Sequence, residues 1–304
     1  MTNPRIAVIG SSNTDMVIKS DKLPRPSETV IGNEFLMNPG GKGANQAVAA
    51  ARLGGEVSFV AKTGDDVFGE KARQHYREEG IITDFIALDR QRSSGIALIM
   101  VDGNGENCIS VASGANATLN QQDIEKAREE IDKSDVILMQ LEIPLPIVKY
   151  VIKTKKAGNR VILNPAPAQK LDDKLLGGIY VLTPNSSEAE MLTGMQINSI
   201  DSARTAANIL KDKGVENVII TLGKKGAFVL SDHISELVPA PAVSAVDSTA
   251  AGDTFNGALA VALANGESLI EATKFANQAA SLSVKKMGAQ VSIPYRAEII
   301  TNNI

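Results

Sequence analysis

Short apolar runs alternate with longer amphipathic stretches over most of the chain. The apolar runs have the length of buried strands and fall at 5–10, 56–62, 135–141, 160–163, 179–182 and 216–221. Between them, helical spacing of apolar residues predicts helices at 44–53, 67–79, 120–132, 146–157, up to 211, at 252–264 and at 269–286. Strands separated by such helices are typical of βαβ units. The pattern therefore predicts an α/β fold with a mostly parallel central sheet and helices on both faces.

Two pairs of extended segments do not follow this rhythm. Residues 16–20 and 29–37 form one pair, and 95–101 with 107–111 form a hairpin that turns at Asp102–Gly105. We expect a single α/β domain over 1–304, with the strands of a small β-sheet lid inserted at about 14–37 and 95–112. A sheet appended in this way is placed to close over a ligand.

Composition narrows the class of protein. Of 304 residues 43% are hydrophobic, and the net charge of −4 gives no reason to expect a nucleic-acid partner or an anionic membrane surface. No apolar run reaches 18 residues, and the N-terminus does not resemble a signal peptide. The one cysteine, Cys108, excludes an intrachain disulfide and predicts a reducing, cytoplasmic location. With only two histidines beside it, a Cys/His zinc cluster cannot be assembled.

The stretch Asp247–Gly257 carries the most specific chemistry. Its first three residues offer oxygen ligands in a tight turn, and Ala250, Ala251 and Gly252 are small enough for a ligand to approach their N–H groups. Asp253 stands where a helical pattern begins, and a helix N-terminus attracts anions. A carboxylate beside an anion site suits phosphoryl transfer. An aspartate that only caps the helix is the alternative.

A second glycine-rich stretch, Gly40–Gln46, leads into the first helix. Its glycines let backbone approach a ligand, and Lys42 and Asn45 can hydrogen-bond polyol oxygens, although a flexible loop with an exposed lysine fits equally well. Polar side chains also follow two strands, with Asn13 and Asp15 after the first and Glu142 after 135–141. Open α/β sheets bind ligands at that edge, whereas an ordinary turn is the other interpretation of Asn13 and Asp15.

Two further strand ends are candidates for nucleotide chemistry. Asn185 and Glu188 open a helix, as either a capping box or a site where Glu188 helps to hold magnesium near phosphates. Thr221–Gly226 turns over glycines directly after a strand, which suits a cradle for phosphates or base. No Walker motif of the form G-x-x-x-x-G-K-[ST] occurs, so phosphate would not be held by a P-loop.

Taken together, the two glycine-containing stretches resemble signatures of the phosphofructokinase-B-type carbohydrate kinase family. The residues concerned are Gly40–Ala47 and Asp247–Gly257. Similarity to the ribokinase branch, over essentially the whole chain, comes from adding Asn13–Asp15, Gln140–Glu142, Asn164–Pro167 and Asn185–Glu188. The resemblance implies a ribokinase-like fold, ATP-dependent phosphorylation of the 5-hydroxyl of D-ribose, and a homodimer formed through the lid strands. Two departures are Ser248, often Thr in the family, and Asn277, where some relatives have His near the adenine.

The resemblance also implies roles for individual residues. Asp253 would be the base, and the anion hole would be the N–H groups of Ala250, Ala251 and Gly252. Ribose would contact Asn13, Thr14, Asp15, Gly41, Lys42, Gly43, Ala44, Asn45, Glu142 and Asp253. ATP would contact Asn185, Thr221, Leu222, Gly223, Lys224, Lys225, Gly226, Gly252, Asp253 and Asn277, with Glu188 in the Mg²⁺ shell. An activating K⁺ or similar monovalent cation would take ligands, largely carbonyls, from Asp247, Thr249, Ser283, Lys286, Gly288 and Ser292.

Sibling activities form the main alternative. A deoxyribokinase or another sugar kinase of the family differs in substrate by as little as one hydroxyl, whereas a nucleoside kinase needs stacking aromatics and the early lid segments offer only Phe35. A non-catalytic sugar sensor is expected to lose Asp253 or the small residues before it, and both are present. The helix N-terminus is expected to lower the pKa of Asp253. Such a weak base suffices if the proton leaves late in a loose transition state.

Overall fold

A nine-stranded sheet forms the centre of the computed structural model, which describes residues 3–302. The ends of the expected domain, 1–2 and 303–304, lie outside the described residues. The strand order is β13-β12-β11-β10-β9-β8-β1-β4-β5. From β11 to β5 in this order, neighbouring strands pair in parallel. Strands β12 and β13 extend the sheet at one edge through antiparallel pairing. The strands are β1 Arg5–Ile9, β4 Glu56–Gly64, β5 Ile86–Asp89, β8 Val136–Met139, β9 Arg160–Leu163, β10 Val181–Leu182, β11 Asn217–Thr221, β12 Ala227–Leu230 and β13 Ser235–Val238.

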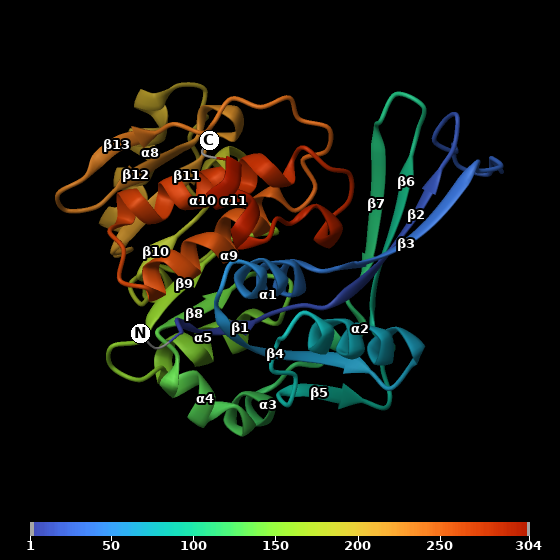
Figure 1. The fold of residues 1–304 in the computed structure, drawn as a ribbon, viewed down its shortest axis with the longest axis horizontal. Coiled ribbons are helices and arrows are strands. Elements are labelled where there is room, and N and C mark those ends of the chain that lie inside the picture. Colours follow the sequence, from blue (N-terminus) through green and yellow to red (C-terminus); the bar gives the residue numbers. More distant parts are fainter. Residues whose placement is uncertain (1–2, 303–304) are drawn as a thin grey trace.

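Helices cover both faces of this sheet (Figure 1). One face carries α1 Lys42–Arg52, α2 Val67–Glu78, α9 Ala251–Ala264, α10 Leu269–Ser283 and α11 Arg296–Asn302. The other carries α3 Gln121–Lys126, α4 Arg128–Lys133, α5 Leu145–Thr154, α6 Asp173–Leu176, α7 Ser186–Thr193 and α8 Ile200–Asp212. Strand β1 shows why a continuous apolar run was needed: Ile6 and Val8 pack on the first face, and Ala7 and Ile9 on the second. The predicted fold class is confirmed.

A separate four-stranded sheet has the order β3-β2-β6-β7 and stands beside the main body at the right of Figure 1. Its strands are β2 Asn13–Lys19, β3 Glu34–Gly40, β6 Gly95–Val101 and β7 Asn107–Ala112. The hairpin expected at 95–111 is present as β6 and β7. The extended segment expected at 29–37 is displaced, because β3 begins only at Glu34 and then runs directly into the glycine stretch before α1.

Other element boundaries also differ from the expectation. The single helix expected at 120–132 is interrupted at Ala127, whose backbone N–H bonds to the carbonyl of Ile124 in a tighter turn between α3 and α4. The helix expected to reach 286 ends at Ser283. The described residues also contain three short 3₁₀ segments: η1 Gly114–Thr118, η2 Gly223–Lys225 and η3 Gln290–Ser292. None of the helices in 3–302 is both long and apolar enough to cross a membrane.

Candidate active site

The carboxyl ends of the parallel strands meet at one edge of the main sheet. Strand β1 ends at Ile9, β8 at Met139, β9 at Leu163 and β10 at Leu182. The polar residues that follow them along the chain include Ser11, Gln140, Glu142, Asn164 and Thr183. This is the edge at which open α/β sheets bind ligands, so the topology assembles polar groups that are far apart in sequence.

Helix α9 points its first turn into the same region. Its N-cap, Ala250, has φ 59°, a left-handed conformation that is unusual for a residue with a Cβ and costs about 1 kcal/mol or more. Both the N–H and the hydroxyl of Thr254 donate to the Ala250 carbonyl and hold the turn. The first N–H groups of a helix have no acceptor inside the helix and can bind an anion. Here the N–H of Ala251 donates to the carbonyl of Ser248 at 3.2 Å.

Two cavities meet at this helix end. The larger, of about 720 Å³, opens toward the four-stranded sheet, and the smaller, of about 220 Å³, lies over the ends of β9 to β11. Lys42, Ala250 and Asp253 line both. A reacting group in one cavity and a second in the other would therefore come together at Asp253.

The larger cavity collects most of the residues expected around the sugar: Asn13, Asp15, Gly41, Lys42, Asn45, Glu142 and Asp253. Three others lie outside it. The side chain of Thr14 lines a separate depression of about 130 Å³, because neighbours along a strand point to opposite faces. Gly43 packs against the backbone of Gly10 and Ser11, and Ala44 is fully buried in the core, so both have a packing role in this structure.

The smaller cavity is lined by Asn185, Glu188, Thr221 and the whole small-residue turn, with Ala250, Ala251 and Gly252. The remaining residues expected around ATP do not line it: Leu222, Gly223, Lys224, Lys225, Gly226 and Asn277. Asn277 is buried and donates to the carbonyls of Val238 and Pro239. Gly226 has φ 101° and packs against the Val238 carbonyl, which leaves no room for a Cβ. Leu222 and Lys225 line a small separate hollow of about 70 Å³.

Asp253 is buried and held by two amide donors from α1. Asn45 Nδ2 donates to one carboxylate oxygen and Gln46 Nε2 to the other, each at 2.9 Å. Burial nevertheless raises the pKa of Asp253, against the opposing effects of Lys42 and the two amides. The expectation that the helix end would lower this pKa was wrong, because desolvation at this depth outweighs the nearby positive charge. A raised pKa makes Asp253 a stronger base than an exposed aspartate.

The carboxylates of Asp15, Glu142 and Asp253 act electrostatically on Lys42, the lysine that lines both cavities. Burial, followed by the charges of Glu142 and Asp253, raises the pKa of Asp15 to about 6. Glu142 is anchored by the hydroxyl of Ser11 at 2.5 Å and by the backbone N–H of Lys42 at 3.0 Å. Burial lowers the pKa of Lys42, but the charges of Asp253 and Glu142 more than offset this, and the net direction is upward. The lysine therefore stays cationic between the two cavities.

The residues expected around a monovalent cation offer an oxygen donor set. Asp247 accepts from the N–H and hydroxyl of Thr249 and from the N–H of Gly288, which ties the 247–249 turn to the segment after α10. These hydrogen bonds outweigh burial and lower the pKa of Asp247, which keeps it anionic. Lys286 pairs its ammonium with Glu298 and so has only its carbonyl to offer. Within 3–302 no group of three or more His, Cys, Asp or Glu side chains could hold a metal ion.

Glu188 serves a structural purpose at the start of α7. Its carboxylate accepts from the N–H of Asn185, whose side chain accepts in return from the N–H of Glu188, and this is a complete capping box. The residue also lines the smaller cavity, and burial raises its pKa. A carboxylate beside a phosphate-sized cavity suits the outer shell of a magnesium ion.

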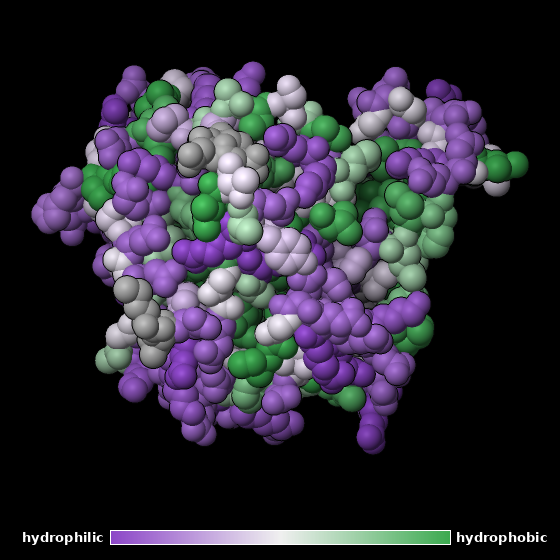
Figure 2. All heavy atoms as spheres, viewed as in Figure 1, coloured by the Kyte–Doolittle hydropathy of each residue, from purple (hydrophilic) through white to green (hydrophobic). Residues whose placement is uncertain are grey.

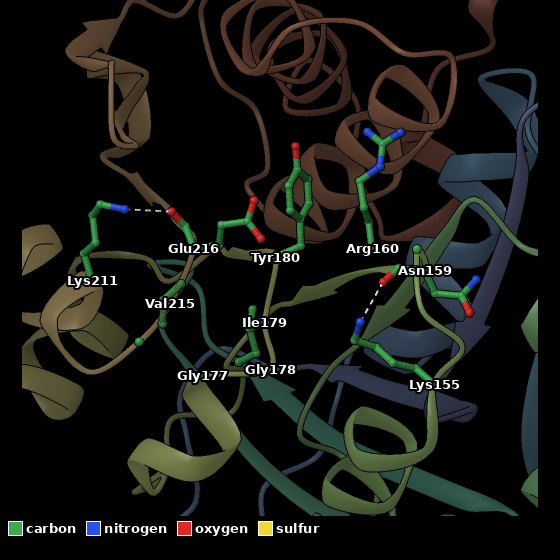
Figure 3. Close-up of a pocket in the computed structure, with 12 residues that line it drawn as sticks. Lys155, Asn159, Arg160, Gly177, Gly178, Ile179, Tyr180, Lys211, Val215 and Glu216 are labelled. Carbon is green, nitrogen blue, oxygen red and sulfur yellow. Dashed lines mark hydrogen bonds between the residues drawn. The ribbon is translucent and has the colours of Figure 1, made fainter.

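The opposite edge of the sheet holds another depression, of about 650 Å³, at the amino ends of β9 to β11 (Figure 3). Its cationic side chains already have backbone acceptors: Lys155 donates to Asn159, Lys211 to Glu216 and Arg160 to Leu263. Arg160 also lies over the ring of Tyr180. These groups brace loops at the edge of the sheet that rarely binds ligands, so we place the candidate active site at the other edge.

Comparison with known proteins identifies the family to which the chain belongs. Residues 3–296 match the family described as pfkB family carbohydrate kinase. The chain is a member of that family. It is 46% identical to a ribokinase of Haemophilus influenzae, with 97% of each chain covered, and 40% identical to a deoxyribokinase of Salmonella typhi, with 95% of each covered. A structure of Arabidopsis thaliana ribokinase complexed with ribose and ATP superposes with a TM-score of 0.90 at 32% identity, over 99% of this chain and 98% of that one.

Several polar residues near this site were given no individual role by the sequence reasoning, although most of them lie in the stretches that carry the family resemblance. The smaller cavity is also lined by Asn164, Thr183 and Asn256. Asn164 accepts from Gln46, and Asn256 accepts from Thr183 while donating to the Gly252 carbonyl. The position of Asn164 directly after a buried strand was the available signal. For Gln46 and Asn256 the sequence holds no comparable signal, because a helical pattern does not indicate which residue the side-chain amide will contact.

Proposed function

We propose that this kinase transfers the γ-phosphoryl group of ATP to the 5-hydroxyl of D-ribose and forms ribose 5-phosphate. One observation carries the proposal: two cavities, one lined by polyol-binding groups and one by a helix N-terminus, share Asp253, Ala250 and Lys42. That geometry suits an in-line transfer between two bound molecules. The ribokinase relatives supply the identity of the sugar.

Asp253 takes the proton of the attacking hydroxyl in this proposal. Its carboxylate is fixed by Asn45 and Gln46, so it is already aimed before the sugar arrives. The sugar cavity supplies further acceptors in Asp15 and Glu142 and an amide in Asn13. Carboxylates and amides in such a cavity match the alternating donors and acceptors of a polyol.

Charge on the moving phosphoryl group is stabilised at the start of α9. Ala250, Ala251 and Gly252 line the smaller cavity, and Lys42 adds a positive charge from α1. Their N–H groups would donate to the phosphoryl oxygens, that of Ala251 by giving up its bond to the Ser248 carbonyl. Fixed donors of this kind cost no reorganisation during reaction. Asn185 and Thr221 are the nucleotide contacts that best fit the cavity, whereas Leu222, Gly223, Lys224, Lys225, Gly226 and Asn277 would need a longer ligand that leaves it.

Two cations complete the proposal. Mg²⁺, held by the phosphates with Glu188 in its outer shell, would neutralise phosphate charge when bound. K⁺ would be held by Asp247 and by carbonyls of the segment that includes Gly288 and Ser292, and it would add positive charge beside the anion hole. The residues of this chain already connect that segment to Asp247.

The four-stranded sheet is proposed to form a homodimer interface as well as a lid. Its strand register puts Asp15, Ala97 and Val111 on the face toward the sugar cavity. The opposite face carries four large exposed apolar side chains, Ile18, Phe35, Met37 and Leu98. Figure 2 shows hydrophobic, green surface in the region of this sheet at the upper right. Contiguous exposed apolar groups on a sheet favour a protein contact over solvent.

A phosphorylation panel tests the activity. Purified protein is given MgATP with ribose, deoxyribose, fructose or adenosine, with and without K⁺, and ADP and the phosphorylated product are measured. We expect ribose to give the highest kcat/KM and K⁺ to raise it. The deoxyribokinase alternative is favoured by the 40% identity to the Salmonella typhi enzyme, and a preference for deoxyribose would establish it instead. Turnover of none of the four would refute the proposal.

Replacing Asp253 tests its role. We expect Asp253→Asn to keep sugar binding and to lose roughly 10²-fold or more in kcat, because the amide cannot accept the proton. Sugar affinity is measured by calorimetry and kcat by coupled ADP release. Asn45 and Gln46 would still be near the new side chain, so folding is monitored by thermal unfolding. Turnover near that of the parent protein would remove Asp253 from the mechanism.

A further inference from the structure

A chain of hydrogen bonds leads from Asp253 away from the cavities. Asn45 donates to Asp253 at 2.9 Å and accepts at its own oxygen from Gln290 Nε2 at 3.0 Å. The oxygen of Gln290 in turn lies 2.8 Å from Nε2 of His75. Asn45 belongs to α1, His75 to α2 and Gln290 to η3, so three separate elements meet behind the carboxylate.

The direction of this chain follows from the chemistry of its end. An ionised carboxylate only accepts, so Asn45 must turn its NH₂ group to Asp253 and its oxygen to Gln290. Gln290 must then present its own NH₂ group, which leaves its oxygen for His75. The Nε2 atom of His75 must therefore carry a hydrogen. Each group along the line is oriented by its neighbours, and His75 ends the line with a ring N–H in place of an amide.

Gln290 is also fixed through its backbone. The guanidinium of Arg52 donates to the carbonyls of Gln290 and Ile293 at 2.6 and 2.9 Å. Arg52 is itself held by two hydrogen bonds to Glu79, in an ion pair whose side chains are about a tenth exposed. Gln290 is 2% exposed, so no solvent competes for its amide. A buried amide in this network is strongly constrained to one orientation.

We infer that Gln290 and His75 are positioning residues for the base, and that they fix the Asn45 amide so that it donates to Asp253. This inference rests on the proposed function only in naming Asp253 as the base. Without Gln290, the Asn45 oxygen loses its donor, and the amide is free to rotate away from the carboxylate. That arrangement withdraws a hydrogen bond that favours the charged form of Asp253.

The test uses Gln290→Leu, His75→Phe and His75→Gln in the full chain. We expect Gln290→Leu and His75→Phe to lower kcat roughly tenfold, while KM for sugar changes less than about twofold, because the loss falls on the base. The acid limb of the kcat/KM profile should move to higher pH, since loss of the Asn45 donor raises the pKa of Asp253. His75→Gln keeps an N–H donor for Gln290 and should stay close to the parent. Val67→Ala, at a side chain that is 54% exposed on α2, the helix of His75, is the matched control.

A second measurement separates this inference from the sugar assignment. The Asp253 carboxyl is titrated by ¹³C NMR in the ligand-free protein, with Asp253→Asn used to assign its signal. The other charged groups that act on Asp253 are unchanged in every variant: Lys42, Glu142, Asp15 and Glu188. An upward shift of the titration in Gln290→Leu and His75→Phe, but not in His75→Gln, supports the inference even if ribose is the wrong substrate.

An Asp253 titration equal to that of the parent in both Gln290→Leu and His75→Phe overturns the inference, whatever happens to kcat. A fall in thermal stability with an unchanged titration overturns it as well, because it leaves these residues a structural role only. If Gln290→Leu does not fold, the two His75 variants decide, since that side chain is only half-buried on the surface helix α2.

Discussion

Asp15 shows how an acidic residue of this site can lower the stability of the folded, ligand-free protein. Asp15 lies close to Glu142 and Asp253, with Lys42 as the one compensating charge, and its pKa is raised to about 6. A carboxyl with a raised pKa binds its proton more tightly in the folded state than in the unfolded chain. Stability from this group is therefore full at low pH and is lost as pH rises toward and through about 6.

Asp15→Asn is expected to stabilise the ligand-free protein at pH 7.5. The raised pKa corresponds to roughly 1–3 kcal/mol after allowance for partial exposure, and the neutral amide avoids this cost. Denaturant unfolding at several pH values should show a gain that grows between about pH 4 and pH 7 and vanishes below pH 4. Sugar affinity should fall at the same time, as is common for active-site charges.

Glu106→Gln is the matched control for this experiment, because Glu106 is an exposed acid on the turn of the same sheet. It should leave the pH dependence of unfolding as it is in the parent. A uniform loss of stability in Asp15→Asn at every pH would contradict the argument, because it would mean that the carboxylate makes a stabilising contact in the folded state.

At this scale the sequence revealed residue types better than their partners. Asp253, Asn45 and Asp15 were identified because glycines and strand ends mark places where a ligand can approach. The fate of Thr14 required the register of β2, in which alternate side chains change face. The pKa of Asp253 required its depth, since helix position and burial shift a carboxyl in opposite directions. The contact of Gln290 with Asn45 could not be predicted, because the two residues lie 245 positions apart in the sequence.

Among the elements, α1 and α9 form the contact that aims the base. Gly257 lies one turn after Asp253 on α9, and a Cβ there would meet the Ala49 side chain at 2.5 Å and the backbone of Ala50 and Gln46 at 2.8 and 2.9 Å. Asn45 and Gln46 lie one turn before these alanines on α1. The close approach of the two helices therefore sets the distance between the carboxylate and its amide donors.

Gly257→Ala should separate these helices and weaken catalysis. The gain in helix propensity is about 1 kcal/mol, but contacts with rigid backbone cost roughly 1–3 kcal/mol, so a net loss of stability is expected. A displaced Asp253 should lower kcat by roughly tenfold or more. Thermal unfolding and steady-state kinetics measure the two effects.

Gly177→Ala provides the comparison for this substitution. Gly177 has an ordinary helical backbone, and its new Cβ would meet only the Asp173 carbonyl at 3.5 Å. Activity and stability of that variant should match the parent. Equal behaviour of the two alanine variants would show that the α1–α9 spacing does not control the base.

Element existence was predictable where a local pattern was strong. The buried strands and the long helices appear near their expected positions, because each is required by apolar periodicity alone. The break at Ala127 was not predictable, since α3 contacts α5 and α4 contacts β1, with no proline or glycine to mark the change. The four-stranded sheet was recognisable because its segments did not fit the helix–strand rhythm, although β3 starts later than expected.

For the whole molecule, the four-stranded sheet raises the question of what covers its outer face. Met16 pairs with Met37 on one side and with Leu98 on the other, so apolar side chains from three strands lie in one row away from the sugar cavity. Leu98 is 54% exposed and Phe35 60% exposed in the single chain. A second copy of the sheet, packed face to face, would bury these side chains and hold the lid at a defined distance from the cavity.

Leu98→Lys and Phe35→Lys should therefore each convert a dimer to a monomer, because a lysine in a packed apolar face loses its hydration. Sedimentation equilibrium should give twice the chain mass of 32.1 kDa for the parent and 32.1 kDa for the variants. Met191→Lys alters a similarly exposed apolar side chain on α7, far along the chain from the lid, and should leave the mass at the parent value.

KM for the sugar should rise in the two lid variants while kcat changes less, since Asp253 and its amide donors belong to the main body and only closure of the sheet is weakened. A parent of 32.1 kDa, or dimers in both lid variants, would mean that the outer face of the sheet is not the interface.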